Sequence, residues 1–386
     1  MKIEYLEIIG LNDSEIPIKI PFNGDVNIIT GRNGSGKTTI LKLMWYCISA
    51  NIERAIREIT FKKVEIVTSV YKLTVELIKT KKQNISHFIL ENPRGEIILE
   101  KKEPIGRESI VDEFNQLTNS LLNTSIFFPT FRRIEGGFSM TSSGSGGSRR
   151  TVTRSGGILY REQHEYGYDI QDALETHASR LSIGKHKFVS SISTVDIQQL
   201  VTRRHNNATT KVDEFSKSLS ENIFSEIENY RETNSSESDA LKDAISTLDR
   251  INQDVTEFEE VREKAFNSLS VLSKIIVTIF KHKGIRLNPR VTLGDIDQSI
   301  NSDALSAGEK QMLSFLCYNA LYQNCPFFID EPELSLHVDW QRILIDVMLE
   351  QGTDNQLFIA THSPFIYSQY EDKEIMIGED RGNDLV

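Results

Sequence analysis

Residues 26–40 read VNIITGRNGSGKTTI, an apolar run that leads directly into a glycine-rich segment. The run 26–30 is typical of a buried β-strand, and the apolar residues from Ile40 onwards recur at helical spacing. Between them, positions 31–38 match the pattern G-x-x-x-x-G-K-[ST]. Phosphate binding by this pattern requires a strand before it and a helix after it. The stretch therefore predicts a P-loop in an α/β fold.

Each part of this P-loop has a physical role. Glycines let backbone N–H groups point inward around phosphate oxygens, and the helix N-terminus adds partial positive charge. We expect Lys37 to reach the β- and γ-phosphates of ATP and the Thr38 hydroxyl to ligate Mg²⁺. The alternative, a glycine-rich turn with an exposed lysine, is disfavoured by the flanking strand and helix. The predicted ATP-binding residues are Arg32, Asn33, Gly34, Ser35, Gly36, Lys37, Thr38 and Thr39.

A second apolar run, PFFI at 326–329, ends in the acids Asp330 and Glu331. Carboxylates at the end of an apolar strand are costly unless a cation lies nearby. We expect Asp330 to act at Mg²⁺, directly or through another ligand, and Glu331 to orient the attacking water or accept its proton. Alone, such acids are as often helix caps. Together with the P-loop, they predict an ATPase.

Three further motifs carry a family resemblance. Residues 305–311, LSAGEKQ, resemble the signature motif of ABC-type ATPases and begin 25 residues before Asp330, in the order that family has. Residues 332–337, PELSLH, resemble its D-loop, and residues 360–364, ATHSP, resemble its switch-histidine segment. Glu309 within the signature is typical of the Rad50, SMC and RecF-like branch rather than of transporters.

The resemblance implies a composite site between two heads that dimerise head to tail around ATP. Ser306, Gly308 and Glu309 of one chain would then face the γ-phosphate held by the P-loop of the other. His362 would contact the γ-phosphate or the attacking water, whereas His337 is expected to be structural. Taken alone, the signature is also an ordinary helix start, in which Ser306 is the N-cap and Glu309 completes a capping box.

The resemblance covers residues 1–60 and 290–370, and the family's Q-loop glutamine has no obvious counterpart. Residues 126–135, IFFPTFRRIE, stand at about its place and resemble a P-x-x-R segment of OLD-like stand-alone prokaryotic ATPases. Arg132 or Arg133 is therefore a candidate phosphate sensor, because guanidinium is a fixed planar cation. A surface arginine pair is the equal alternative.

The chain divides into three predicted segments. Residues 1–135 form an N-terminal ATPase lobe with the P-loop and an antiparallel meander over 62–101, where strand alternation is visible. Residues 136–290 form a flexible loop and a helical insert, and residues 291–386 form a C-terminal ATPase lobe. The predicted fold class is α/β, a P-loop NTPase with an ABC-type head (a mainly parallel sheet plus the meander) and a helical insert.

The Ser/Gly/Arg-rich stretch 139–157 predicts a mobile loop. Helical patterns over 212–232 and 237–281 predict an insert that we expect to be far too short for a long antiparallel coiled-coil arm. Further strands are predicted at 3–10, 125–128, 326–330, 356–360 and 374–377, and further helices at 109–122, 307–322 and 337–350.

Composition narrows the cellular setting. A net charge of -11 over 386 residues repels polyanions and anionic membranes. No apolar run reaches the 18 residues of a membrane span, and the start MKIE lacks a signal peptide's features. Cys47, Cys317 and Cys325 lie in apolar segments and are expected to be buried, reduced thiols. We expect a cytoplasmic protein.

The chain most resembles compact RecF/OLD-like prokaryotic ATPases, many of which serve anti-phage systems. About 20 residues follow Pro364, which leaves no room for the TOPRIM nuclease that some relatives carry. We therefore expect a separate effector, a toxin or nuclease, as in PARIS and Septu systems, with a PARIS-like ATPase preferred. The expected function is a nucleotide-driven sensor and switch in defence.

The alternative is a RecF/Rad50-like ATPase that clamps DNA during repair. Few basic residues are candidates for contacting DNA. They are Arg149, Arg150, Arg154 and the run 203–205. With this net charge, DNA binding would be weak and steeply salt-sensitive. The large insert and Glu309 disfavour a transporter subunit. A structural ATP clamp without turnover is a third possibility.

Overall fold

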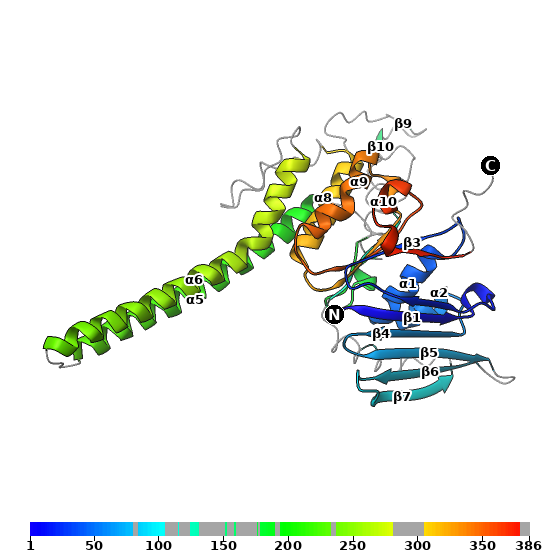
Figure 1. Ribbon diagram of the computed structural model, residues 1–386. Helices are drawn as coiled ribbons and strands as arrows, with labels where there is room; N and C mark the ends of the chain where they lie inside the picture. The colour runs from blue at the N-terminus through cyan, green and yellow to red at the C-terminus, as the bar shows by residue number, and fades with distance from the viewer. Residues whose placement is uncertain are drawn as a thin grey trace.

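A computed structural model of the chain describes residues 1–79, 84–104, 115, 124–130, 151–152, 158–159, 176, 178–189, 194–232, 237–280 and 305–378. They form an α/β head from which a long pair of helices projects (Figure 1). The predicted helix over 109–122 and most of the stretch 139–157 lie outside these residues. Within the latter, only the strand β9 (Thr151–Val152) is described, paired with β10 (Ile158–Leu159).

The head is built on a sheet of six parallel strands in the order β11-β8-β12-β13-β3-β14. The P-loop strand β3 lies between two C-terminal strands, so the two ends of the chain fold into one sheet. The predicted strands at 326–330 and 356–360 have the bounds expected. The six strands are β3 (Val26–Thr30), β8 (Ile126–Phe128), β11 (Lys187–Phe188), β12 (Pro326–Asp330), β13 (Gln356–Ala360) and β14 (Glu374–Met376).

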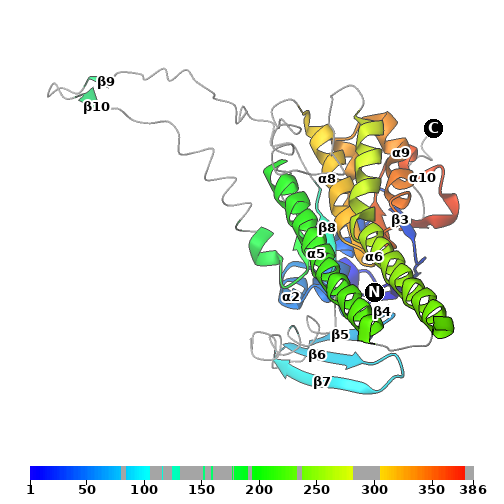
Figure 2. The ribbon, with the colours of Figure 1, turned by 90° about the vertical axis from the view of Figure 1, so that its left-hand side faces the viewer.

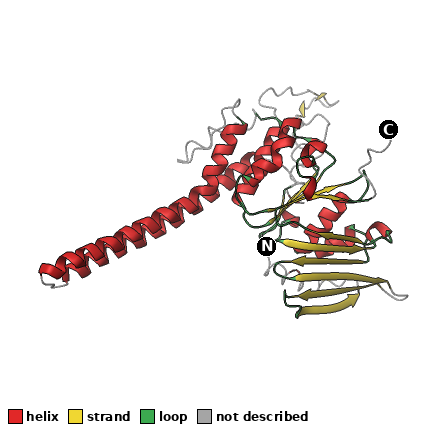
Figure 3. Ribbon diagram, viewed as in Figure 1, coloured by secondary structure: helices red, strands yellow, loops and turns green. Residues whose placement is uncertain are grey.

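A second sheet, which is antiparallel, has the order β2-β1-β4-β5-β6-β7. Its last four strands are the predicted meander, and the turn between β6 and β7 is closed by a hydrogen bond from the Gly95 N–H to the Asn92 carbonyl, 2.9 Å. Strands are yellow in Figure 3. The six strands are β1 (Ile3–Ile9), β2 (Ile18–Pro21), β4 (Lys63–Thr68), β5 (Lys72–Lys79), β6 (Asn84–Glu91) and β7 (Ile97–Pro104).

Helices α1 (Lys37–Ile48) and α2 (Ile52–Glu58) lie between the two sheets (Figure 1). Side chains alternate along each strand of the parallel sheet. Phe328 packs with α1 and the antiparallel sheet, whereas Phe327 and Ile329 pack on the opposite face. Every residue of β12 and β13 is buried, as expected for a parallel sheet covered on both faces.

The outer face carries α8 (Ala307–Leu321) and α9 (Val338–Leu349), both within a residue of the predicted helices. Short helices complete the head: η1 (Leu11–Asp13), η4 (Pro332–Leu334), α10 (Pro364–Tyr367) and η5 (Glu371–Lys373). The three cysteines are free and buried, as predicted, and burial raises the pKa of Cys317 and Cys325 to about 12.

The insert forms an arm, and the expectation that it is too short for one is wrong. Helix α5 (Thr194–Glu232) has 39 residues and α6 (Glu237–Ile279) has 43, which gives lengths of roughly 60 Å. The predicted helix began at 212, but the true one starts 18 residues earlier because its first turns pack in the head, where Ile197 and Val201 are buried. Figure 2, in which the arm points toward the viewer, shows the two helices side by side.

Among the described helices, none combines the length and the apolar character that crossing a bilayer demands. The division of the chain at residues 135 and 290 stays a prediction.

Candidate active site

The P-loop connects β3 to α1 at the carboxyl edge of the parallel sheet. At Gly31, whose φ is 146°, a Cβ atom would lie 2.3 Å from the Ile377 carbonyl oxygen, so only glycine lets the two backbones pass this closely. Gly36 is the N-cap of α1, with a φ of 96° that also favours glycine. The first N–H groups of a helix have no partner within it, so this start is suited to an anion.

Lys37 is buried at the mouth of α1, with only 4% of its surface exposed. Its ammonium donates hydrogen bonds to the carbonyl oxygens of Gly31 (3.0 Å) and Arg32 (3.1 Å), and it lies 2.7 Å from Nε2 of His362. Burial lowers the pKa of Lys37, while nearby carboxylates, Glu331 first among them, act to raise it. The Lys37 ammonium therefore lies within the loop that the sequence predicts to bind phosphate.

Asp330 ends β12 and is buried beside the P-loop. The hydroxyl of Thr38 donates a 2.9 Å hydrogen bond to its Oδ1, and the hydroxyl of Thr130 donates to its Oδ2. The sequence predicted the pairing of Thr38 with Asp330 at one site but missed Thr130. The only signal for Thr130 is its position two residues after β8, the strand that neighbours β12.

This arrangement fits Mg²⁺ and phosphate in two respects. Carboxylate and hydroxyl oxygens are the hard donors that Mg²⁺ prefers. In addition, the Ser35 hydroxyl is buried without a hydrogen-bond partner in the described part of the chain. Because buried polar atoms are usually paired, an orphaned hydroxyl in the P-loop indicates a position that a ligand oxygen can satisfy.

Glu331 and His362 lie on the other side of the same pocket. Glu331 has a φ of 48° and a ψ of 57°, a left-handed conformation that costs a non-glycine residue about 1–3 kcal/mol. Its N–H donates to the Ala360 carbonyl on β13 (2.8 Å), and its Oε1 lies 3.9 Å from Nε2 of His362. Burial and the Lys37 charge lower the pKa of His362. The two predicted catalytic residues therefore lie side by side.

Glu333 is a further site residue that the sequence did not single out. Its Oε1 accepts a 2.6 Å hydrogen bond from the His362 backbone N–H, and burial raises the pKa of its carboxyl. The D-loop-like segment 332–337 contained it, but nothing local showed that it would reach the segment after β13.

These residues surround a pocket of about 660 Å³. Six of the eight predicted ATP-binding residues line it, whereas Arg32 and Ser35 do not. Asn12, on η1, is a lining residue without any sequence signal. Arg132 and Arg133 lie outside the described residues. The lining residues are Asn12, Asn33, Gly34, Gly36, Lys37, Thr38, Thr39, Glu331, Glu333, Leu334 and His362.

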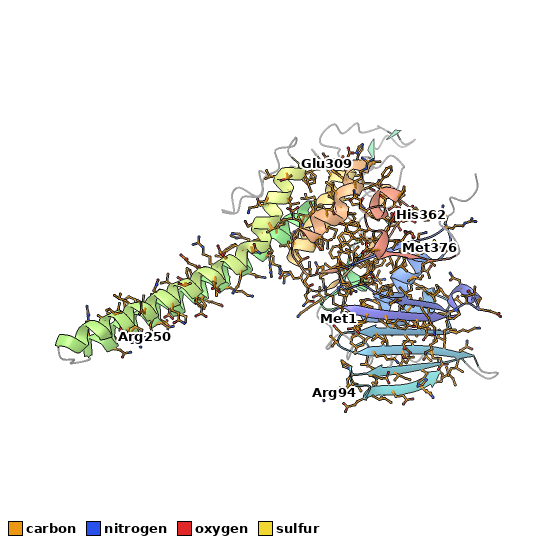
Figure 4. The ribbon with its side chains drawn as sticks, viewed as in Figure 1. Met1, Arg94, Arg250, Glu309, His362 and Met376 are labelled. Atoms are coloured by element: carbon orange, nitrogen blue, oxygen red, sulfur yellow. The ribbon has the colours of Figure 1, made fainter. Side chains whose placement is uncertain are left out.

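The signature residues lie away from this pocket, as Figure 4 shows by the separation of Glu309 from His362. Ser306 caps α8, and the capping box predicted with Glu309 is present: the Ser306 N–H donates to Glu309 Oε2 at 2.6 Å. At Gly308, a Cβ would lie 2.4 Å from the Ser335 carbonyl oxygen. The start of α8 is therefore packed directly on the D-loop-like segment.

The covered parallel sheet, the P-loop and the acids after β12 define a P-loop NTPase fold. Within this class, the chain belongs to the AAA ATPase domain family (AAA_15), whose model matches residues 1–367.

Three individual proteins similar to this chain are one curated protein and two solved structures. Over 165 residues the chain is 27% identical to Endonuclease GajA of Bacillus cereus (strain VD045); the match covers 38% of this chain and only 28% of GajA. The Pyrococcus furiosus Smc head domain with an extended coiled coil, solved bound to the ScpA C-terminal domain, gives a TM-score of 0.37 at 15% identity, over 95% of this chain and 91% of that chain. An SmcHead bound to the C-winged helix domain of ScpA gives 0.42 at 13% identity, over 99% and 96%.

Proposed function

We propose that this chain hydrolyses ATP and uses the nucleotide state to control a separate effector in anti-phage defence. The observation that carries the ATPase proposal is one convergence. Lys37, Thr38, Glu331 and His362 line a single pocket, and Asp330 is hydrogen-bonded to Thr38 beside it, although about 300 residues of chain separate the P-loop from the other group.

In this proposal, the P-loop holds the phosphates of ATP. Lys37 supplies a full positive charge and α1 supplies its N-terminal N–H groups and partial charge. Residues 32–36 and Thr39 complete the cradle. Lys37 lies 2.7 Å from Nε2 of His362, so a phosphate that contacts both groups has to replace this direct hydrogen bond.

Thr38 and Asp330 are the residues proposed to hold Mg²⁺. Thr130 fixes the second oxygen of Asp330 and so keeps the carboxylate turned toward Thr38. Mg²⁺ held by these residues would supply positive charge next to the phosphates of ATP. The donor set fits that ion because the Thr38 hydroxyl and the Asp330 carboxylate are both hard oxygen donors.

Glu331 is proposed to orient the attacking water and to accept its proton. Its left-handed backbone directs the side chain to the pocket rather than along the strand. His362, neutral near pH 7 because its pKa is lowered, can donate or accept a hydrogen bond at the same place. Glu333 acts through His362 by holding its backbone.

A complete site is proposed to need two chains. Ser306, Gly308 and Glu309 do not line the pocket of their own chain, and the start of α8 is suited to a phosphate from another head. A head-to-tail dimer, or a higher homo-oligomer, would bring them to a partner's ATP.

The support for a defence role is the similarity to GajA, a relative named an endonuclease. The match covers 38% of this chain and 28% of GajA. A PARIS-like pairing with a separate toxin or nuclease is the specific form we propose. The second candidate is a RecF/Rad50-like repair ATPase. Among the described residues it is favoured by the basic run 203–205 near the arm's base, whereas the net charge of -11 opposes it.

The first test measures ATP turnover by the purified chain with and without duplex DNA ends. Glu331→Gln, which keeps the shape of the side chain, should still bind ATP, lose turnover by about 10²–10⁴-fold and trap an ATP-bound oligomer. Wild-type behaviour of this variant would mean that ATP is a structural clamp. Salt-sensitive stimulation by DNA would favour repair, and indifference to DNA would favour defence.

A further inference from the structure

The outer half of the arm exposes several large apolar side chains to solvent. Phe224 is 70% exposed and Ile227 38% on α5, and Ile245 is 52% and Leu248 64% exposed on α6. Single exposed apolar residues are ordinary, whereas a contiguous group on one surface marks an interaction site.

The packing of the two helices places them on one flank. Within each helix, the two residues are three positions apart and so lie along one stripe. Each follows a more buried residue of the α5–α6 seam by one position: Ile223 precedes Phe224, and Thr247 precedes Leu248. In an antiparallel pair, the position after the seam turns to the same side on both helices, because reversing the chain direction also reverses the sense of rotation.

An ion pair shows which residues of α5 and α6 lie at the same distance along the arm. Arg250 on α6, labelled in Figure 4, lies 3.2 Å from a carboxylate oxygen of Glu226 on α5. This contact sets Ile227 beside Leu248, with Phe224 and Ile245 to either side. We call these four residues the arm stripe. It lies on one flank of the α5–α6 pair, in the arm's outer half.

The charge of the arm indicates what kind of partner can bind at the arm stripe. Residues 211–264 hold seven Lys and Arg residues against fifteen Asp and Glu residues, a net charge of -8 out of the chain's net charge of -11. That excess repels nucleic acid, anionic membrane and a second copy of the same arm. It favours a cationic partner with an apolar side, and an amphipathic helix presents such a side as a stripe.

We propose that the arm stripe is a docking site for a basic amphipathic helix of a partner protein. The helix would place apolar residues spaced at i, i+3 and i+7 on the arm stripe, while its Lys and Arg residues face the acidic rim, which includes the exposed Glu228 and Asp249. The inference concerns the arm alone and does not depend on ATP hydrolysis.

The test uses two synthetic helical peptides with the same leucine face, one with lysine and one with glutamate at all other positions. Binding to the full chain is measured by fluorescence anisotropy at low and high salt. We expect the lysine peptide to bind, the glutamate peptide not to bind, and the double variant F224S/L248S to weaken lysine-peptide binding at least tenfold. Ile97→Ser, an exposed apolar residue on β7, is the matched control and should change nothing.

A second variant keeps the apolar surface and changes only the rim. E228K/D249K should weaken the lysine peptide severalfold, with wild-type helix content by circular dichroism and wild-type ATP turnover. Equal binding of both peptides, or no effect of F224S/L248S, would overturn the proposal. So would a lower mass of F224S/L248S than wild type in sedimentation, because the stripe would then be covered by a second copy.

Discussion

The ammonium nitrogen of Lys37 lies 2.7 Å from Nε2 of His362, across 325 residues of sequence. Lysine is a donor only, so Nε2 accepts this hydrogen bond and His362 is neutral when the contact forms. The lowered pKa of His362 agrees with that role, since burial and the Lys37 charge both oppose protonation. The contact joins the loop after β3 to the loop after β13 at the place where the γ-phosphate is expected.

His362→Ala should lower ATP turnover by about 10²-fold or more while leaving ATP affinity within a few-fold of wild type. The reason is that Lys37 keeps its carbonyl contacts and remains available to the phosphates. Turnover and nucleotide affinity are measured on the same preparation.

Glu333→Ala should lower ATP turnover less than His362→Ala does, because it removes only the acceptor that holds the His362 N–H. Glu333→Gln keeps a side-chain oxygen that can accept this hydrogen bond and should restore most of the turnover. If His362→Ala, Glu333→Ala and Glu333→Gln all have wild-type ATP turnover, His362 takes no part in the reaction.

Thr130→Val should raise the Mg²⁺ concentration needed for half-maximal turnover by about tenfold, the lower end for removing an outer partner of a metal ligand. Valine has the shape of threonine but cannot hydrogen-bond to Asp330 Oδ2. Thr130→Ser retains the hydroxyl and is the control. A valine variant with wild-type Mg²⁺ dependence would show that Thr130 does not support the metal ligand.

The local motifs were predictable from sequence, whereas the contacts between them were not. The P-loop, the acids after β12 and the capping box of α8 each depend on a few neighbouring residues with strong conformational preferences. Thr130 and Glu333 have roles only because β8, β12 and β13 are neighbours in the parallel sheet, and sequence does not give strand order directly. The site roles stay proposals.

The prediction that the insert is too short to form an arm is wrong for a related reason. Residues 194–211 are polar enough to resemble surface structure, and only their packing against α8 and α6 makes them the foot of a 39-residue helix. Tertiary packing, rather than local propensity, stabilises most helices in proteins.

Gly308→Ala should reduce ATP-dependent oligomerisation and turnover without abolishing ATP binding. An added Cβ would meet the Ser335 carbonyl oxygen at 2.4 Å, so α8 or the D-loop-like segment has to shift. Overpacking of this kind costs about 1–3 kcal/mol, and the pocket of the same chain does not include Gly308. Sedimentation with ATP and the E331Q background tests the effect, with Ser306→Thr, which keeps a capping hydroxyl, as the mild control. Loss of ATP binding by the isolated variant would contradict a role between chains.

The last prediction concerns His186, which is buried and accepts or donates a 2.8 Å hydrogen bond with Ser125 through Nδ1. Burial lowers its pKa from 6.5 to about 4. Below pH 6.5 the unfolded chain therefore binds a proton that the folded chain does not, so stability is fully present above that pH and is lost as the pH falls toward 4. Between pH 7 and pH 5 the loss from this residue is roughly 2 kcal/mol. Chemical denaturation at both pH values should show a smaller drop for His186→Gln than for the wild type, even if the variant is less stable overall. His337→Gln, at an exposed histidine, should keep the full drop. An unchanged drop in His186→Gln would mean that other groups dominate acid destabilisation.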